Sequence, residues 1–196
     1  MKWDAYRKTD ATVEPVTVSE AKTHLRVDWS TDDTYIGTLI AAARQRCEAY
    51  SNRAYISQTW VMKLSKFASV IQLPMPRLIS ITSLKYTTKT GTQTTLTENT
   101  DFKVDRAVEP GIIFFPTWLK VPPADYGGEY PVEIEYLCGY GASAASVPQH
   151  VKQAILLQVG NLYENRENII VGQGIAQYRL NQGAEFLLDV DRMTPI

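Results

Sequence analysis

Residues 30–64 read STDDTYIGTLIAAARQRCEAYSNRAYISQTWVMKL, and the spacing of their apolar side chains changes partway along. From Ile36 to Tyr50, apolar residues recur at steps of three and four, which predicts one buried face of an amphipathic helix. From about Ala54 the period falls to two, with Trp60, Met62 and Leu64 on one face, which predicts a β-strand. The stretch therefore joins a helix to a strand, and the fold is expected to be mixed.

The helix is flanked by residues that begin and end helices. Ser30 can cap its first turn, and Asn52 can end it in a left-handed conformation. Upstream, Thr17 and Glu20 have the spacing of a capping box, in which each satisfies a backbone amide beside the other. A shorter helix is therefore predicted over Val18–Arg26.

The alternation continues downstream of the first strand. Val132, Ile134, Tyr136 and Cys138 alternate with two glutamates and a leucine. Breaks rich in proline and glycine separate similar short runs before them, so residues 56–138 are predicted to form about six antiparallel strands.

A third helix is predicted from Pro148 to Arg166, because proline is favoured in the first turn of a helix. Its apolar residues lie nearly all round, so it must be covered on most sides. A buried core helix and a helix shared with another subunit both satisfy this requirement. The pattern weakens after Arg166, apart from a last short apolar segment at Ala184–Met193.

These elements predict an α+β fold in which helices from both ends of the chain pack together. The helical domain is expected to comprise residues 1–55 and 139–196, with residues 1–16 as an extended lead-in. The antiparallel β domain, residues 56–138, is inserted between the two helical parts. The helical core is predicted to contain Ile36, Leu39, Ile40, Ile155, Val159 and Leu162.

Composition excludes several classes of protein. The 196 residues are 44% hydrophobic and 21% charged, which is typical of a globular chain. The net charge is -1 and no part of the chain has an excess of either sign, which argues against a dedicated DNA-binding face or a polybasic membrane anchor. The densest apolar run, Ala154–Val159, is far too short to span a membrane, and no signal peptide is expected at the N-terminus.

No constellation of catalytic or metal-binding residues emerges. Cys47 and Cys138 lack the spacing of a zinc or redox motif and are expected to be buried, reduced thiols. His24 and His150 have no nucleophile or acid at motif spacing. Gly139-Tyr140-Gly141 lacks the further residues of a phosphate-binding loop. The chain is therefore expected to be no enzyme and to need no metal or cofactor.

Five stretches occur in the same order as in a known family. They are Val18–Asp28, Asp32-Asp33 with the stripe Ile36–Glu48 and Tyr50, Leu73-Pro74-Met75-Pro76 with Ile79-Ser80-Ile81, Tyr136–Gly141, and Val147–Glu167. Together they cover about residues 17–168 and resemble the head–tail connector proteins of tailed phages, closest to those of long-tailed phages with an inserted β domain.

This resemblance implies a structural virion protein rather than an enzyme. Such proteins form a ring, usually of twelve copies, beneath the portal protein, and the ring extends the DNA channel without binding DNA specifically. The expected partners are the portal, other copies of the chain, and a head-closure (stopper) or tail-completion protein. The expected location is the head–tail junction of the virion, assembled in the bacterial host cytoplasm, with no membrane contact. The alternative is a monomeric β-rich binding module of a phage tail or adhesion apparatus.

Two sets of residues are candidates for contacts in such an assembly. Arginine and tyrosine side chains off the apolar stripes predict a subunit interface, because arginine can bind carboxylates through two hydrogen bonds. That set is Arg44, Arg46, Glu48, Tyr163 and Arg166. A C-terminal segment with apolar anchors but little chain to cover them predicts a portal-binding tail, comprising Tyr178, Leu180, Phe186, Leu187 and Leu188. The alternative for this tail is that Ala184–Met193 packs back on the helices of its own chain.

Overall fold

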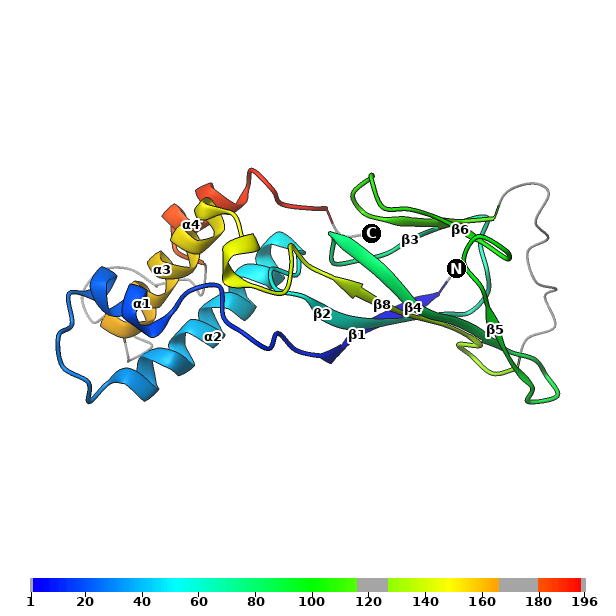
Figure 1. Cartoon of the computed structure of the whole chain (residues 1–196), viewed down its shortest axis with the longest axis horizontal. Helices are drawn as coiled ribbons and strands as arrows, with labels where there is room; N and C mark the ends of the chain where they lie inside the picture. Colours follow the sequence, from blue (N-terminus) through cyan, green and yellow to red (C-terminus); the bar gives the residue numbers. More distant parts are fainter. Residues whose placement is uncertain (1, 116–126, 166–179, 195–196) are drawn as a thin grey trace, which may run out of the picture. The chain divides into compact units, whose positions relative to one another are not determined.

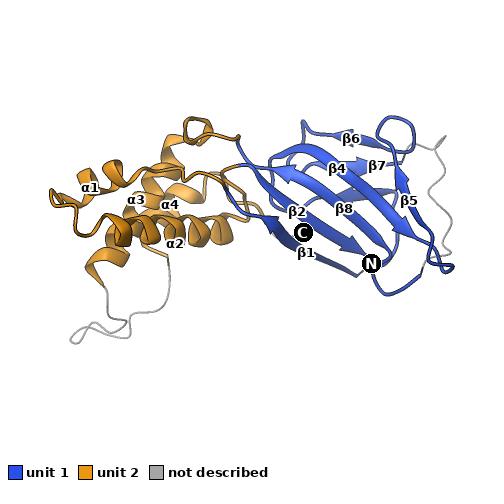
Figure 2. Ribbon diagram, turned by 60° about the horizontal axis from the view of Figure 1, so that its bottom comes forward, with its two compact units in different colours: residues 1–11, 57–140, 195–196 blue, residues 12–56, 141–194 orange. Residues whose placement is uncertain are grey.

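The computed structural model describes residues 2–115, 127–165 and 180–194 (Figure 1). The chain divides into two compact units (Figure 2). Unit 1 comprises residues 1–11, 57–140 and 195–196, and unit 2 comprises residues 12–56 and 141–194. One unit is built from strands and the other from helices, so the predicted α+β fold class is confirmed.

In the described residues, unit 2 consists of α-helices with one short 3₁₀-helix. The elements are α1 (Val18–Leu25), α2 (Asp33–Ser51), η1 (Ala144–Ser146), α3 (Gln149–Glu164) and α4 (Gln182–Leu188). Helices α2 and α3 pack against each other, and α1 and α4 each contact both of them.

The predicted capping box begins α1. The backbone amide of Thr17 donates to Oε2 of Glu20 at 2.7 Å, and the amide of Glu20 donates to the Thr17 hydroxyl at 3.2 Å. The predicted Ser30 cap of α2 is wrong. The carbonyl of Ser30 instead accepts from the amide of Asp33 in a turn, so the helix begins after that turn. The predicted end is correct, because Asn52 adopts a left-handed conformation with φ 51°.

Four of the six predicted core residues of the helical unit are buried. They are Ile36, Ile40, Ile155 and Val159. The other two, Leu39 and Leu162, are only half-buried. The chain itself thus covers much of α3, although Leu156 and Leu157 also keep part of their surface exposed.

In its described residues, unit 1 contains two antiparallel sheets. Its strands are β1 (Trp3–Thr9), β2 (Gln58–Leu64), β3 (Val70–Gln72), β4 (Leu78–Thr87), β5 (Gln93–Leu96), β6 (Lys103–Asp105), β7 (Ile112–Phe114) and β8 (Val132–Cys138). The order is β1-β2-β8-β4-β5 in the larger sheet and β3-β7-β6 in the smaller one. Strand β8 lies at the centre of the larger sheet, and its predicted alternation is correct, since Val132, Ile134, Tyr136 and Cys138 are all buried.

The first strand belongs to this sheet rather than to the helical part. Residues Trp3–Thr9 pair antiparallel with β2, with Trp3 opposite Leu64 and Arg7 opposite Trp60. Pairing along β2 therefore places residues 1–11 in unit 1. The strand lies at the sheet edge, where charged side chains are tolerated, so it lacks the apolar alternation that would mark it in the sequence.

Both cysteines are buried and free, as predicted. Burial raises the pKa of the Cys47 thiol to about 12. The thiol therefore stays protonated at neutral pH and acts as a small apolar side chain.

Candidate interaction surfaces

The two histidines each lie beside a residue from another element of unit 2. His150, in the first turn of α3, places Nε2 2.8 Å from Oδ2 of Asp191. His24 lies in α1, near Gly160 of α3. Over the described ranges, no three histidine, cysteine, aspartate or glutamate side chains gather in a way that could hold a metal ion. No helix in the same ranges has the length and apolar character needed to cross a membrane.

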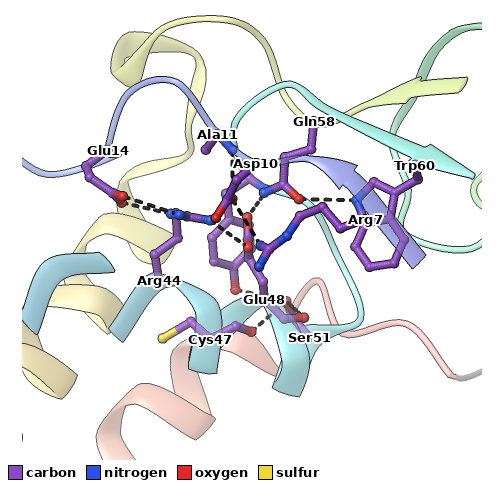
Figure 3. Close-up of polar contacts among 11 residues, drawn as sticks. Arg7, Asp10, Ala11, Glu14, Arg44, Cys47, Glu48, Ser51, Gln58 and Trp60 are labelled. Carbon is purple, nitrogen blue, oxygen red and sulfur yellow. Dashed lines mark hydrogen bonds and ion pairs between the residues drawn. The ribbon is translucent and has the colours of Figure 1, made fainter. Parts of the chain in front are cut away.

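Arg44 lies at the centre of a buried charged cluster in unit 2 (Figure 3). Its Nε donates to Oε2 of Glu14 at 2.8 Å, and its Nη2 donates to the other oxygen of Glu14 at 3.3 Å. Its Nη1 donates to Oε2 of Glu48 at 3.0 Å, one turn along α2. The guanidinium thus joins the chain segment before α1 to the middle of α2.

The cluster extends beyond the three charges. Oε1 of Glu48 accepts from the backbone amide of Tyr55 at 2.9 Å, which holds the chain after α2. The hydroxyl of Tyr55 lies 2.8 Å from the hydroxyl of Ser51. Arg44 therefore connects α2 to the lead segment, and Glu48 connects it to the segment that leaves the helix.

This geometry corrects the predicted roles of Arg44 and Glu48. Arg44 is only 2% exposed and Glu48 only 3%, so neither can bind a neighbouring subunit without unpacking the helical unit. The sequence placed them off the apolar stripe and therefore on the surface. The lead segment covers that side of α2, and an ion pair with Glu14 replaces the lost hydration of the guanidinium.

The remaining candidates for a subunit interface differ in position. Arg46 is exposed on α2. Tyr163 is half-buried, and its hydroxyl donates to Oδ2 of Asp32 at 2.6 Å, while its ring lies 6.2 Å from that of Tyr35. Arg166 lies outside the described residues. Contacts of Arg46 and Tyr163 with another subunit therefore stay predictions.

Two of the predicted tail residues are core residues of the chain itself. Leu180 and Leu188 are 3% and 1% exposed. The side chain of Asn181 caps α4 by accepting from the amide of Gly183, and one face of the helix packs on α3. Leu180 and Leu188 are therefore unavailable to a portal protein in this conformation, which corrects their predicted role.

The outer side of α4 remains available. Phe186 is 78% exposed, and Leu187 is half-buried. Val190, four residues after Phe186, is also 78% exposed. Tyr178 lies outside the described residues. Phe186 and Leu187 thus stay candidates for a contact with a partner.

The structure has the alternative arrangement, in which Ala184–Met193 packs back on the helices of its own chain, and it includes residues 189–193, which we call the C-terminal clasp. The sequence did not predict the individual contacts of the clasp. Three kinds of contact hold it to the end of α2. The Tyr50 hydroxyl donates to Asp189 at 2.8 Å, and the guanidinium of Arg192 lies 4.3 Å from the centre of the Tyr50 ring. The amide of Met193 donates to the carbonyl of Ser51 at 3.0 Å, and the side-chain amide of Asn52 donates to the carbonyl of Met193 at 2.8 Å. The clasp is polar and short, so no periodic pattern marks it in the sequence.

Comparison with known proteins gives a family match to part of the chain and a fold for nearly all of it. Residues 15–102 match the model of the phage gp6-like head-tail connector protein family. A chain of the structure described as the virion of a native gene transfer agent (GTA) particle has a TM-score of 0.78 at 20% identity, covering 98% of this chain and 96% of that one. No curated protein matches the chain.

Two neck structures of the same kind of particle are also similar. The neck of an empty GTA particle, computed with C6 symmetry, gives a TM-score of 0.72 at 20% identity, covering 100% of this chain and 97% of that one. The neck of a native GTA particle, computed with C12 symmetry, gives a TM-score of 0.69 at 22% identity, covering 100% of this chain and 97% of that one. The resemblance to phage head–tail connector proteins that the sequence indicated is therefore confirmed over residues 15–102 by the family model. The GTA particle chains share the fold.

Proposed function

We propose that this chain is a structural subunit of a ring that joins the head of a tailed phage, or of a phage-like particle, to its tail. The match of residues 15–102 to the connector family carries the proposal. The fold similarity to chains from particle necks, over nearly the whole length of both chains, supports it.

The ring contains twelve copies and extends the DNA channel below the portal. One of the similar neck structures was computed with C12 symmetry, which supports this copy number. The near-neutral charge of the chain is suited to a channel, because a strongly basic lumen would hold the DNA backbone rather than let it pass.

The partners of the ring are the portal protein on the head side and a head-closure (stopper) or tail-completion protein on the tail side. The ring is assembled in the host cytoplasm and remains in the virion. The chain acts through these contacts and catalyses no reaction. Arg46 and Tyr163, together with Arg166, are the residues we assign to contacts between neighbouring copies, and the segment with Tyr178 is assigned to the portal.

The test combines the purified chain with the portal protein encoded in the same genome. Negative-stain class averages of the mixture should show a second ring of twelve copies on one end of each portal ring. A chain that stays monomeric and does not bind portal rings at micromolar concentrations would contradict the proposal and favour the monomeric binding module.

A further inference from the structure

We draw no further inference here: the strongest candidate, the apolar hollow of unit 2 that Val13 and Val16 before α1 and Gly37 and Ile40 of α2 line, carries nothing, because nothing in the described residues shows what covers it.

Discussion

Two polar networks contact the C-terminal half of α2, and they differ in burial. Near the middle of α2, Arg44 is enclosed with Glu14 and Glu48, and the guanidinium is almost inaccessible to water. At the C-terminal end of α2, the clasp residues Asp189 and Arg192 keep about half of their side-chain surface exposed. Both networks connect segments that are distant in sequence, so sequence separation does not distinguish them. Exposure to water distinguishes the two networks, and it should decide how much each contributes to the free energy of unfolding.

The physical reason is the cost of an unpaired charge. Removing one member of a buried ion pair leaves the other without water or a partner. Removing one member of an exposed pair leaves a charge that water solvates again at once. The comparison predicts a large loss of stability for the first network and a small one for the second.

The largest effect is therefore expected for Arg44→Met, which keeps much of the side-chain volume and removes the charge. It should lower the free energy of unfolding by about 3–5 kcal/mol, because two carboxylates lose their buried partner. Urea unfolding followed by circular dichroism measures the change. Arg46→Met, at an exposed position on the same helix, should change it by less than about 0.5 kcal/mol. Equal effects of the two substitutions would contradict the role of burial.

The same contrast can be tested with apolar side chains on α2. Ile40→Ala should cost about 2–5 kcal/mol, because the side chain is fully buried. Leu39→Ala should lower the free energy of unfolding less, by about 1 kcal/mol. Leu39 is only half-buried, so its side chain buries less apolar area on folding. Urea unfolding of both variants gives the comparison. A larger loss for Leu39→Ala than for Ile40→Ala would mean that Leu39, and not Ile40, makes the main apolar contacts of this part of α2.

These residues also indicate how far the sequence determines the fold. The helix and strand periods predicted α2 and β8 because each has one buried face and one solvated face. They misplaced Arg44 and Glu48, because a charged residue beside an apolar stripe looks solvated unless the segment that covers it is known. That segment holds Glu14, 30 residues earlier, and it carries no apolar period.

The same limit applies to the C-terminal part of the chain. The sequence predicts Leu188 as a portal anchor, because the short segment around it has little chain to cover it, and leaves packing of Ala184–Met193 on the chain's own helices as the alternative. The structure has Leu188 buried, as the alternative requires. The clasp lies on the end of α2, more than 130 residues away in sequence, and its polar side chains follow no pattern. Long-range contacts between irregular segments are the part of this fold that local periodicity in the sequence cannot predict.

An intermediate effect is expected at the capping box of α1. Thr17→Ala should lower the free energy of unfolding by about 1 kcal/mol, the usual contribution of an N-cap side chain.

Hydrogen bonds, first from the backbone amide of Thr17 and then from its hydroxyl, lower the pKa of Glu20 below its ordinary value. A lowered pKa in the folded state means that the ionised carboxylate stabilises the fold above its ordinary pKa, and that this contribution is lost as the pH falls through the folded-state value.

The pH dependence can be isolated by comparing the unmodified chain with Glu20→Gln. The difference in melting temperature between the two should be greatest near pH 7 and should shrink toward pH 3. A difference that does not change over this range would mean that the ionised carboxylate does not stabilise the cap.

The smallest effect is expected at the clasp. Burial and the hydrogen bond to Asp189 raise the pKa of the Tyr50 phenol, so its hydroxyl stays protonated and donates at neutral pH. Tyr50→Phe removes this hydrogen bond but keeps the ring on which Arg192 lies. Because the lost partner remains exposed to solvent, the free energy of unfolding should fall by less than about 1 kcal/mol. Arg192→Gln should have a similarly small effect, and salt should diminish it by screening the exposed charges. A loss as large as that of Arg44→Met would show that the clasp, and not the buried cluster, holds α2 in the helical unit.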